Sequence, residues 1–351
     1  MSLLFDFFAE YVISYFKEKG WSKNICRKCG TIFLSKRNED CCEKATCKVN
    51  AYETIKNKRK KIDWTQFNIV INDFFLRKGY TKKSLPNVYN KASGDTAYVV
   101  AALQLYNNDL MHGNRLSELK IYNPQACIRL NDFSESLFQV GFLHSFVNVA
   151  TLKINANIID YCTFLDDWIS FLSLIGIHAS RLKIVLVNSY VNIKNIYYGW
   201  GCDITLDGLE LGCCNYYDKI VSSNMREYTG IDCGFSIERL FWCANGGEFW
   251  DGLLPADLKI CPSKVDYINE DTLRTIVLIV MSGIVPGAQN VKYHLKKMLT
   301  ILLKRNYNIV LLEQNIDYYY DYWKNYLEVR VPLIECKKLI FNYFRDAYFN
   351  Q

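Results

Sequence analysis

The chain has 351 residues; half of them are hydrophobic, 22% are charged, and the formal net charge is +6. This composition excludes a disordered or fibrous chain and favours a folded protein with room for two or three domains. The mild positive charge permits an RNA partner without demanding one.

Three features bear on the compartment of the protein. The apolar opening is interrupted by Asp6 and Glu10 and no basic residues precede it, so we expect an amphipathic helix over residues 3–19 rather than a secretory signal. No window of about 18 uncharged apolar residues occurs, and we expect no membrane span. Fourteen cysteines scattered along a long chain favour the reducing cytoplasm, with a few of them used for metal.

A cysteine cluster follows the first helix. Cys26 and Cys29 are followed about a dozen residues later by Cys42 and Cys47, and Cys41 is the alternative for the third position. Short spacers allow four thiolates to surround one ion tetrahedrally, so we expect a Zn²⁺ knuckle. Four protein ligands leave no open position for chemistry, which makes the expected role structural. A loop-rich segment with free thiols is the alternative interpretation.

The next segment is basic and then helical. Residues 56–61 form a basic run that is typical of a solvated linker, with weak RNA contact as the alternative. Residues 64–78 have apolar positions at helical spacing and end at Gly79. Pro86 then interrupts an extended segment, and residues 96–105 form an apolar element rich in small residues.

An arginine lies in an apolar frame at the start of a predicted hairpin. We expect strands over residues 126–130 and 143–152, with Arg129 inside the first. A guanidinium buried there needs an anionic partner or a wet cleft, because burying it alone is costly. A structural carboxylate is the ordinary partner. However, Arg239 lies in a similar frame near Asp232, and two such arginines with an aspartate indicate a site for a polyphosphate and an ammonium group.

The remaining elements are predicted from periodicity. Residues 162–175 are expected to form a helix, 183–187 a strand, and 199–218 a hairpin turned at Asp207-Gly208. Residues 271–351 are helical by period and rich in tyrosine, with a helix pair over 273–282 and 290–304.

Two motifs carry a family resemblance. The stretches CIRLND (127–132) and GIDCGFSIERL (230–240) resemble motifs 2 and 3 of the class II aminoacyl-tRNA synthetases. The chain looks like the archaeal type of alanyl-tRNA synthetase, which also opens with a helix, a CxxCG and a later CxxxxC. The likeness covers nearly the whole chain in order and spacing. It implies an α+β fold, in which helices flank an antiparallel class II sheet, with an N-terminal zinc knuckle of four cysteines and a C-terminal helical domain.

The resemblance also implies roles for single residues. Arg129 would bind the α-phosphate of ATP and the substrate carboxylate, and would stabilise the charge that builds up as that carboxylate attacks phosphorus. Arg239 would bind the γ-phosphate, with Glu238 beside it in the ATP site. Asp232 would receive the α-ammonium group of the amino acid.

Several positions depart from the family pattern. Asp203 stands where the family has a glutamate and is a candidate Mg²⁺ ligand. Asn215 falls on a position that is apolar in the family, near the substrate side chain, where a polar residue could select another amino acid. The loop 137–142 lacks the arginines and histidine of the family, and Val147 replaces a glutamate.

The C-terminal helices resemble the family's middle domain, which receives the acceptor stem of tRNA. Lys292, Lys296 and Lys297 are therefore candidate tRNA contacts, although a solvated basic helix face is the ordinary interpretation. The four histidines, at positions 112, 144, 178 and 294, provide no HxxxH spacing, so we expect no hydrolytic editing.

Together these expectations define three domains: the helix and knuckle (1–61), the catalytic core (62–258) and the helical domain (259–351). The function expected is activation of a small amino acid, alanine, with ATP and Mg²⁺, followed by transfer to tRNA. The alternatives are transfer to a carrier protein, peptide or small molecule, and a catalytically inert tRNA-binding paralogue. We expect a cytoplasmic monomer or homodimer with no membrane partner, in a form that lacks the editing and C-terminal domains.

Overall fold

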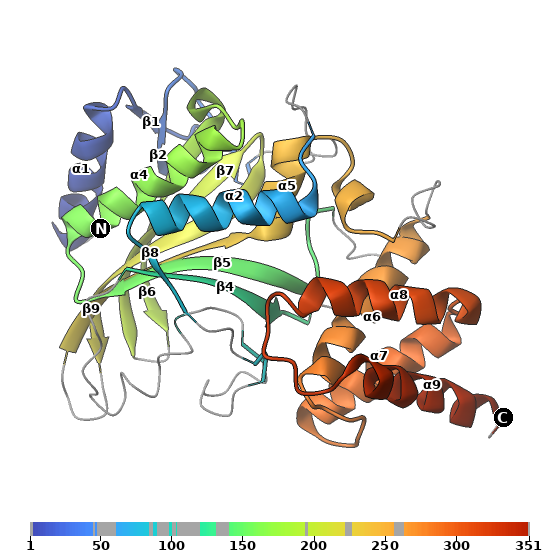
Figure 1. Cartoon of the computed structure of the whole chain (residues 1–351). Helices are drawn as coiled ribbons and strands as arrows, with labels where there is room; N and C mark the ends of the chain where they lie inside the picture. The colour runs from blue at the N-terminus through green and yellow to red at the C-terminus, as the bar shows by residue number, and fades with distance from the viewer. Residues whose placement is uncertain are drawn as a thin grey trace. The chain divides into compact units, whose positions relative to one another are not determined.

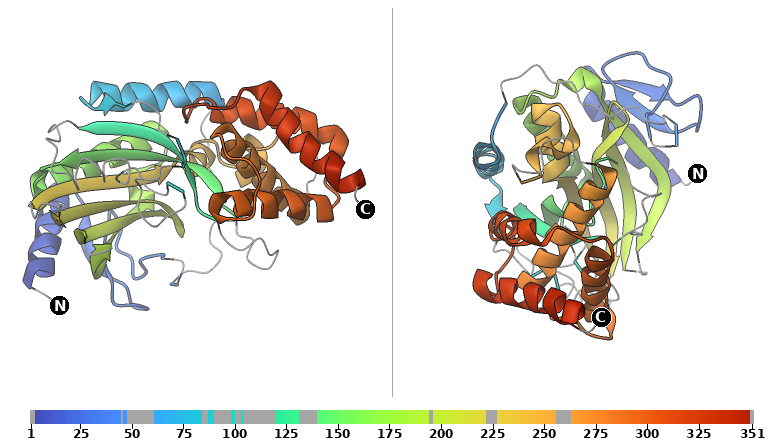
Figure 2. Two further views of the ribbon diagram at one scale, coloured as in Figure 1. Left: turned by 90° about the horizontal axis from the view of Figure 1, so that it is seen from below. Right: turned by 90° about the vertical axis from the view of Figure 1, so that its right-hand side faces the viewer.

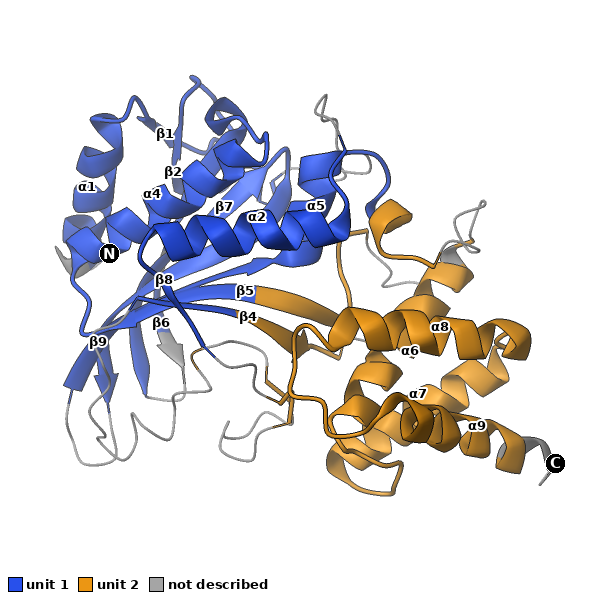
Figure 3. Ribbon diagram, viewed as in Figure 1, with its two compact units in different colours: residues 1–83, 106–123, 149–249 blue, residues 84–105, 124–148, 250–351 orange. Residues whose placement is uncertain are grey.

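The computed structural model describes residues 3–44, 46–47, 61–83, 87–89, 98–99, 103, 120–130, 140–193, 196–221, 227–255 and 263–349. The chain forms two compact units that alternate along the sequence (Figure 3). Unit 1 comprises residues 1–83, 106–123 and 149–249, and unit 2 comprises residues 84–105, 124–148 and 250–351. The division into three domains stays a prediction. The basic run before Lys61, Pro86, most of residues 96–105 and residues 137–139 lie outside the described residues.

Within the described residues, nine strands pair in the order β1-β2-β6-β7-β8-β9-β5-β4-β3 (Figure 1). They are β1 (Ser22–Ile25), β2 (Ile32–Ser35), β3 (Thr81–Lys82), β4 (Ile121–Ile128), β5 (Ser145–Ile154), β6 (Leu182–Ile193), β7 (Tyr197–Leu206), β8 (Leu209–Val221) and β9 (Glu227–Ser236). Neighbours from β1 to β9 in this order are antiparallel, whereas β3 and β4 are parallel. β4 and β5 are each divided between the units. The expected antiparallel sheet with flanking helices is confirmed.

The helices of unit 1 are α1 (Leu3–Lys17), α2 (Trp64–Arg77), α4 (Ile158–Leu174) and α5 (Ile237–Asn245). α1 and α4 cover one face of the sheet, which we call the back face. Trp168 of α4 stacks on Phe235 of β9 with ring centroids 3.8 Å apart. The hydroxyl of Tyr161, also on α4, donates to the Cys214 carbonyl oxygen at 3.0 Å. Phe8 of α1 stacks on Trp200 of β7. Because side chains alternate along a strand, the residues between these contacts point to the opposite, front face.

The β7–β8 hairpin turns at Asp207 and Gly208, as the sequence predicts. Both residues have positive φ, 50° and 96°. A two-residue turn with positive φ at both positions matches the right-handed twist of the flanking strands, and Asp-Gly is among its preferred sequences. The hairpin therefore fixes the pairing of β7 with β8 from its tip.

Unit 2 contains α6 (Lys264–Met281), α7 (Asn290–Lys304), α8 (Ile309–Trp323) and α9 (Leu333–Phe349), which gather into one helical group (Figure 2). The predicted helix pair is confirmed, although α6 begins earlier than position 273. Its start is set by Ser263, whose side chain forms a capping box with Asp266. No helix among the described residues has the length and hydropathy that crossing a bilayer requires.

Candidate functional site

Three of the predicted site residues meet on the front face of unit 1. Directly paired residues of antiparallel strands point to the same side of a sheet. Gly201 of β7 pairs with Asn215 of β8, which in turn pairs with Asp232 of β9. Asp203 lies two positions from Gly201 on β7 and so faces the same way. The register thus places Asp203, Asn215 and Asp232 on the same face of three adjacent strands.

Gly201 makes room for the Asn215 side chain. A Cβ atom built on Gly201 would lie 2.4 Å from Asn215 Oδ1 and 3.0 Å from the Cys214 carbonyl oxygen. Only a residue without a side chain leaves this space open, so the Asn215 amide lies directly against the β7 backbone. This contact fixes where Asn215 presents its polar group on the front face.

Asp232 is a buried carboxylate, only 7% exposed. Tyr197 and Tyr217 lie nearby with ring centroids 5.4 Å apart. Burial raises the pKa of both tyrosines, and the negative charge of Asp232 raises it further. Both phenols therefore stay protonated at neutral pH. A fixed carboxylate beside two tyrosine rings is chemically suited to receive a small ammonium-bearing group.

Arg239 lies in the first turn of α5, directly after β9. Ser236 caps this helix: its Oγ accepts from the Arg239 backbone N–H at 3.4 Å and donates to Glu238 Oε2 at 2.9 Å. The Arg239 guanidinium donates through Nη1 to the carbonyl oxygen of Glu210 at 2.6 Å. Arg239 is half-buried and Glu238 is 1% exposed. Their contacts with ATP stay predictions.

Asp203 already has a cationic neighbour. Lys44 Nζ, from the cysteine-rich segment, lies 3.4 Å from Asp203 Oδ2. Burial raises the pKa of Asp203, the charge of Glu210 raises it further, and Lys44 opposes both effects. The repulsion between two carboxylates is what a divalent cation would relieve, and hard oxygen donors are the ligands that Mg²⁺ prefers. Asp203 and Glu210 therefore fit a magnesium ion chemically.

The four predicted cysteines converge, and their geometry fits zinc. The Sγ atoms of Cys26, Cys29, Cys42 and Cys47 all lie within 4.8 Å of one another. Two of the separations are 3.9 Å, between Cys26 and Cys47, and 3.6 Å, between Cys29 and Cys42. Tetrahedral Zn–S bonds of about 2.3 Å require sulfur atoms about 3.8 Å apart. Cys41 is not in this set, so the structure favours Cys42 for the third position.

The electrostatics of Cys26 also suit a metal ligand. Burial acts to raise the pKa of its thiol. Hydrogen bonds from the backbone of Cys42, Cys29 and Lys28 outweigh that effect and lower the pKa to about 6. The thiolate, which is the form that binds metal, is therefore favoured at neutral pH.

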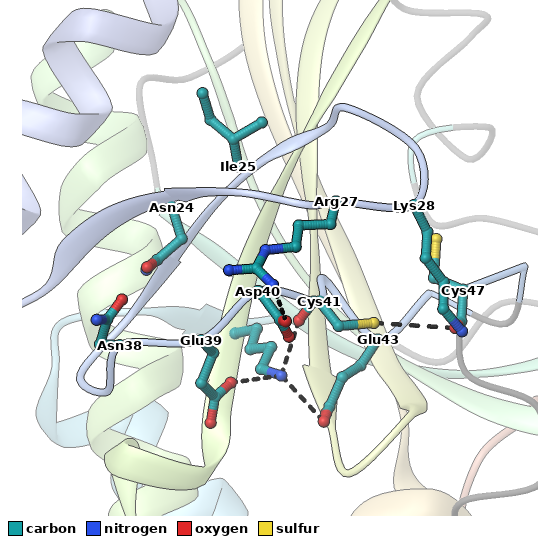
Figure 4. A pocket seen from close by; sticks show the side chains of 11 residues that line it. Asn24, Ile25, Arg27, Lys28, Asn38, Glu39, Asp40, Cys41, Glu43 and Cys47 are labelled. Carbon is teal, nitrogen blue, oxygen red and sulfur yellow. Dashed lines mark hydrogen bonds and ion pairs between the residues drawn. The ribbon is translucent and has the colours of Figure 1, made fainter.

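The cysteine knuckle (residues 26–47) packs on the front face beside the candidate residues. Val185 of β6 belongs to the same buried cluster as Phe33 and the cysteines, and it pairs directly with Asp203. A cavity of about 790 Å³ is lined by residues of the knuckle that include Glu39, Cys41 and Glu43 (Figure 4). The side chain of Lys183, which is 4% exposed, also lines this cavity. Sequence patterns did not indicate this contact, because it depends on which strand pairs with β6.

In unit 2, Arg129 follows the end of β4. The prediction that it lies inside a strand over residues 126–130 is wrong, since β4 ends at Ile128. Every residue of β4 is buried, whereas Arg129 is exposed; a guanidinium cannot continue such a strand without losing its hydration. Its backbone N–H donates to the His144 carbonyl oxygen at 2.8 Å, and its guanidinium lies 5.1 Å from the Phe146 ring centroid.

Helix α6 is hydrogen-bonded to the start of β5, the strand that follows Arg129 in the chain. Asp271 Oδ2 accepts from the His144 backbone N–H at 2.9 Å, and Arg274 Nη1 donates to the Ser145 carbonyl oxygen at 2.9 Å. Arg274 is 1% exposed and lies against the rings of two aromatic residues of α8. Sequence reasoning missed these residues. The available signal was a pair of opposite charges three positions apart, directly before the apolar run of residues 276–281.

The three candidate tRNA contacts lie on α7. Lys292, Lys296 and Lys297 are all exposed. Lys292 and Lys296 are four residues apart and so share one side of the helix, and Lys297 directly follows Lys296. This arrangement suits a phosphate backbone, and it equally suits a solvated helix surface.

No family model matches the chain. In sequence it is similar to the alanine–tRNA ligase of Ignicoccus hospitalis (21% identity, covering 66% of this chain and 27% of that protein). The enzyme of Methanosarcina mazei is 24% identical over 70% of this chain and 28% of its own length. The enzyme of Methanocorpusculum labreanum is 31% identical over 35% of this chain and 14% of its own length. The chain therefore spans less than a third of the length of these relatives.

Among solved structures, the chain is similar to two of pyrrolysyl-tRNA synthetase from Desulfitobacterium hafniense. Sequence identities are 15% and 13%, and TM-scores are 0.40 and 0.42. The two matches cover 52% and 56% of this chain, and 69% and 74% of the synthetase chains. Likeness at this level is too weak to carry an argument. The sequence similarity, by contrast, confirms the resemblance predicted from the motifs: over 66–70% of its length, this chain is similar to alanine–tRNA ligases.

Proposed function

We propose that this protein activates a small amino acid, alanine in the first place, with ATP, and transfers the resulting aminoacyl group to tRNA. The observation that carries the proposal is the row formed by Gly201, Asn215 and Asp232, followed in the chain by Arg239 at the start of α5. It combines an ammonium-binding carboxylate with a cation in the order expected for motif 3. The sequence similarity to alanine–tRNA ligases supports the same class.

In this proposal Asp232 binds the α-ammonium group, and the two buried tyrosines beside it limit the size of the substrate side chain. Asn215 presents an amide to that side chain. A hydroxyl-bearing substrate would find a hydrogen-bond partner there, which makes serine the first competitor of alanine.

The proposed reaction is an in-line attack of the substrate carboxylate on the α-phosphorus, with pyrophosphate as the leaving group. Arg129 stabilises the charge that develops at the α-phosphate, and Arg239, with Glu238 beside it, binds the γ-phosphate. The protein supplies position and positive charge rather than a covalent nucleophile. Mg²⁺, when bound, neutralises phosphate charge, and Asp203 is the residue proposed to hold it. Zn²⁺ in the knuckle has a structural role.

The exposed lysines of α7 are the proposed contacts for the acceptor stem of tRNA. Lys292, Lys296 and Lys297 would bind phosphates, which position a nucleic acid without reading its sequence.

A different acceptor is the second candidate function. The loop 137–142 contains no basic residue, and Val147, fully buried on β5, occupies a position where the family has a glutamate. Both departures weaken the case for binding tRNA ends. Amino-acid activation with transfer to a carrier protein, peptide or small molecule accounts for them while keeping Arg129, Asp232 and Arg239.

The experiment is amino-acid-dependent exchange of labelled pyrophosphate into ATP, across all twenty amino acids, with and without total tRNA. Exchange with alanine or serine is expected. Asp232→Asn should raise KM for the amino acid, and Arg239→Ala should lower kcat/KM by about a hundredfold. Arg77→Ala, on the exposed side of α2, is the matched control.

Each result has a separate meaning. Exchange accompanied by aminoacylation of tRNA supports the first function. Exchange without aminoacylation supports the second. Folded protein that gives no exchange with any amino acid refutes activation and leaves an inert paralogue.

A further inference from the structure

The cysteine knuckle and the candidate site share one row of the sheet. Phe33 of β2 pairs with Val185 of β6, and Val185 pairs with Asp203 of β7. Phe33 and Val185 are buried under the cysteines. The next residue along this row is Asp203. The edge of the knuckle therefore lies beside a carboxylate of the candidate site.

Lys44 bridges this boundary. It lies between Cys42 and Cys47, the two ligands of the second half of the knuckle, and its Nζ is 3.4 Å from Asp203 Oδ2. The side chains of Lys44 and Asp203 are 28% and 22% exposed. This partial burial reduces screening by solvent and salt relative to an ordinary surface pair.

The segment that carries Lys44 is fixed at both ends. Lys183 forms ion pairs with Glu39 and with Glu43, the latter at 2.9 Å, and donates to the Cys41 carbonyl oxygen at 2.9 Å (Figure 4). Beyond Lys44, the chain is tied by Cys47 to the metal-binding set. Lys183 therefore anchors the chain directly before Lys44, and Cys42 and Cys47, on either side of Lys44, belong to the metal-binding set.

We propose that Lys44 is a positioning residue for Asp203, held in place by the metal-loaded knuckle. The ion pair fixes the orientation of the Asp203 carboxylate on the front face of the sheet. Loading the knuckle and binding Mg·ATP are then coupled through Lys44. The link to ATP rests on the proposed function, whereas the link between metal, Lys44 and Asp203 does not.

The first test needs no activity. Lysine acylation by an N-hydroxysuccinimide ester is measured residue by residue with mass spectrometry, on zinc-loaded and on chelator-treated protein. The labelling rate of Lys44 should rise about threefold in Asp203→Asn and by a similar factor on zinc removal, as expected for losing a partly exposed ion pair. Lys23, which pairs with Glu10 outside the knuckle, serves as the internal control and should not change.

The second test is kinetic and uses zinc-loaded protein. Lys44→Ala should raise KM for Mg·ATP in pyrophosphate exchange about tenfold, with kcat within about twofold. Lys44→Arg, which keeps the charge, should restore most of the loss. Arg27→Ala is the matched control, because Arg27 pairs with Asp40 on the outer side of the knuckle. Zinc content and thermal unfolding are measured for every variant.

The two tests separate the two proposals. Lys44 labelling that is unchanged by both Asp203→Asn and zinc removal overturns the role of Lys44, whatever the activity. Labelling that responds as expected in a protein without exchange supports the pairing and refutes activation. A rise in KM that Lys44→Arg does not reverse contradicts a positioning role.

Discussion

Replacing Glu270 by glutamine should remove a pH-dependent loss of stability from unit 2. Glu270 lies on α6 and is 2% exposed. It accepts hydrogen bonds from the hydroxyls of Tyr307 and Tyr319, the latter at 2.6 Å, and from Asn315 Nδ2 at 3.2 Å. These three donors connect α6 to α8 and to the turn before it.

The size of the effect follows from the buried carboxyl. Burial, only partly offset by the three hydrogen bonds, raises the pKa of Glu270 from 4.5 to about 7. A raised pKa means that the folded state prefers the protonated acid. Its stabilisation is therefore complete below pH 4.5 and is lost as the pH rises through 7. A difference of about 2.5 pH units at 1.36 kcal/mol each gives roughly 3 kcal/mol.

The assay is urea unfolding followed by circular dichroism between pH 4.5 and pH 8. The free energy of unfolding of the unchanged protein should fall by about 3 kcal/mol more over this range than that of Glu270→Gln. Glu335→Gln, at an exposed position of α9, is the control and should keep the steeper dependence. Parallel pH profiles for the unchanged protein and Glu270→Gln would refute the reasoning.

Three further changes have defined outcomes. Cys42→Ser should abolish binding of one zinc ion per chain, measured by atomic emission, because three thiolates do not close a tetrahedral structural site. Asp271→Asn should lower kcat for pyrophosphate exchange about tenfold with little effect on KM for the amino acid, since it loosens the strand that contacts Arg129. Replacing Lys292, Lys296 and Lys297 together by alanine should weaken tRNA binding and reduce the slope of log K against log salt by about 2 to 3.

Each of these changes has a control. Cys41→Ser should keep full zinc content, and its loss would contradict the choice of Cys42. Thr300→Ala, on α7 but without charge, and Lys338→Ala, whose amine pairs with Glu335 at 2.9 Å, should leave tRNA binding unchanged. An unaltered salt slope in the triple variant would exclude the α7 surface as a phosphate contact. If Asp271→Asn leaves kcat unchanged, α6 does not position Arg129.

Much of this arrangement was predictable from local patterns. The zinc set follows from short cysteine spacers, the β7–β8 turn from Asp207-Gly208, and α7 from a helical period with matching ends. Each of these signals is contained within about 20 residues, so its physical cause can be seen in the sequence itself.

The remainder depends on contacts between distant segments. The pairing of Asn215 with Asp232 depends on the register between β8 and β9. A shift of one residue would turn one of the two side chains to the other face of the sheet. The Lys44–Asp203 contact joins residues far apart in the chain, and it requires the knuckle to pack on β6. For Arg129 the apolar neighbours suggested a strand interior, but the strand ends at the residue before it, because the charge keeps its hydration.

The contact between Gly201 and Asn215 limits how this part of the front face can change over time. A single methyl group at position 201 would push the Asn215 amide away from β7, and the Cys214 carbonyl oxygen leaves that methyl little other room. The residues allowed at position 201 therefore depend on the residue at position 215. A side chain at position 201 requires the residue at position 215 to move or to become shorter, so a library built to redesign this part of the sheet varies both positions at once.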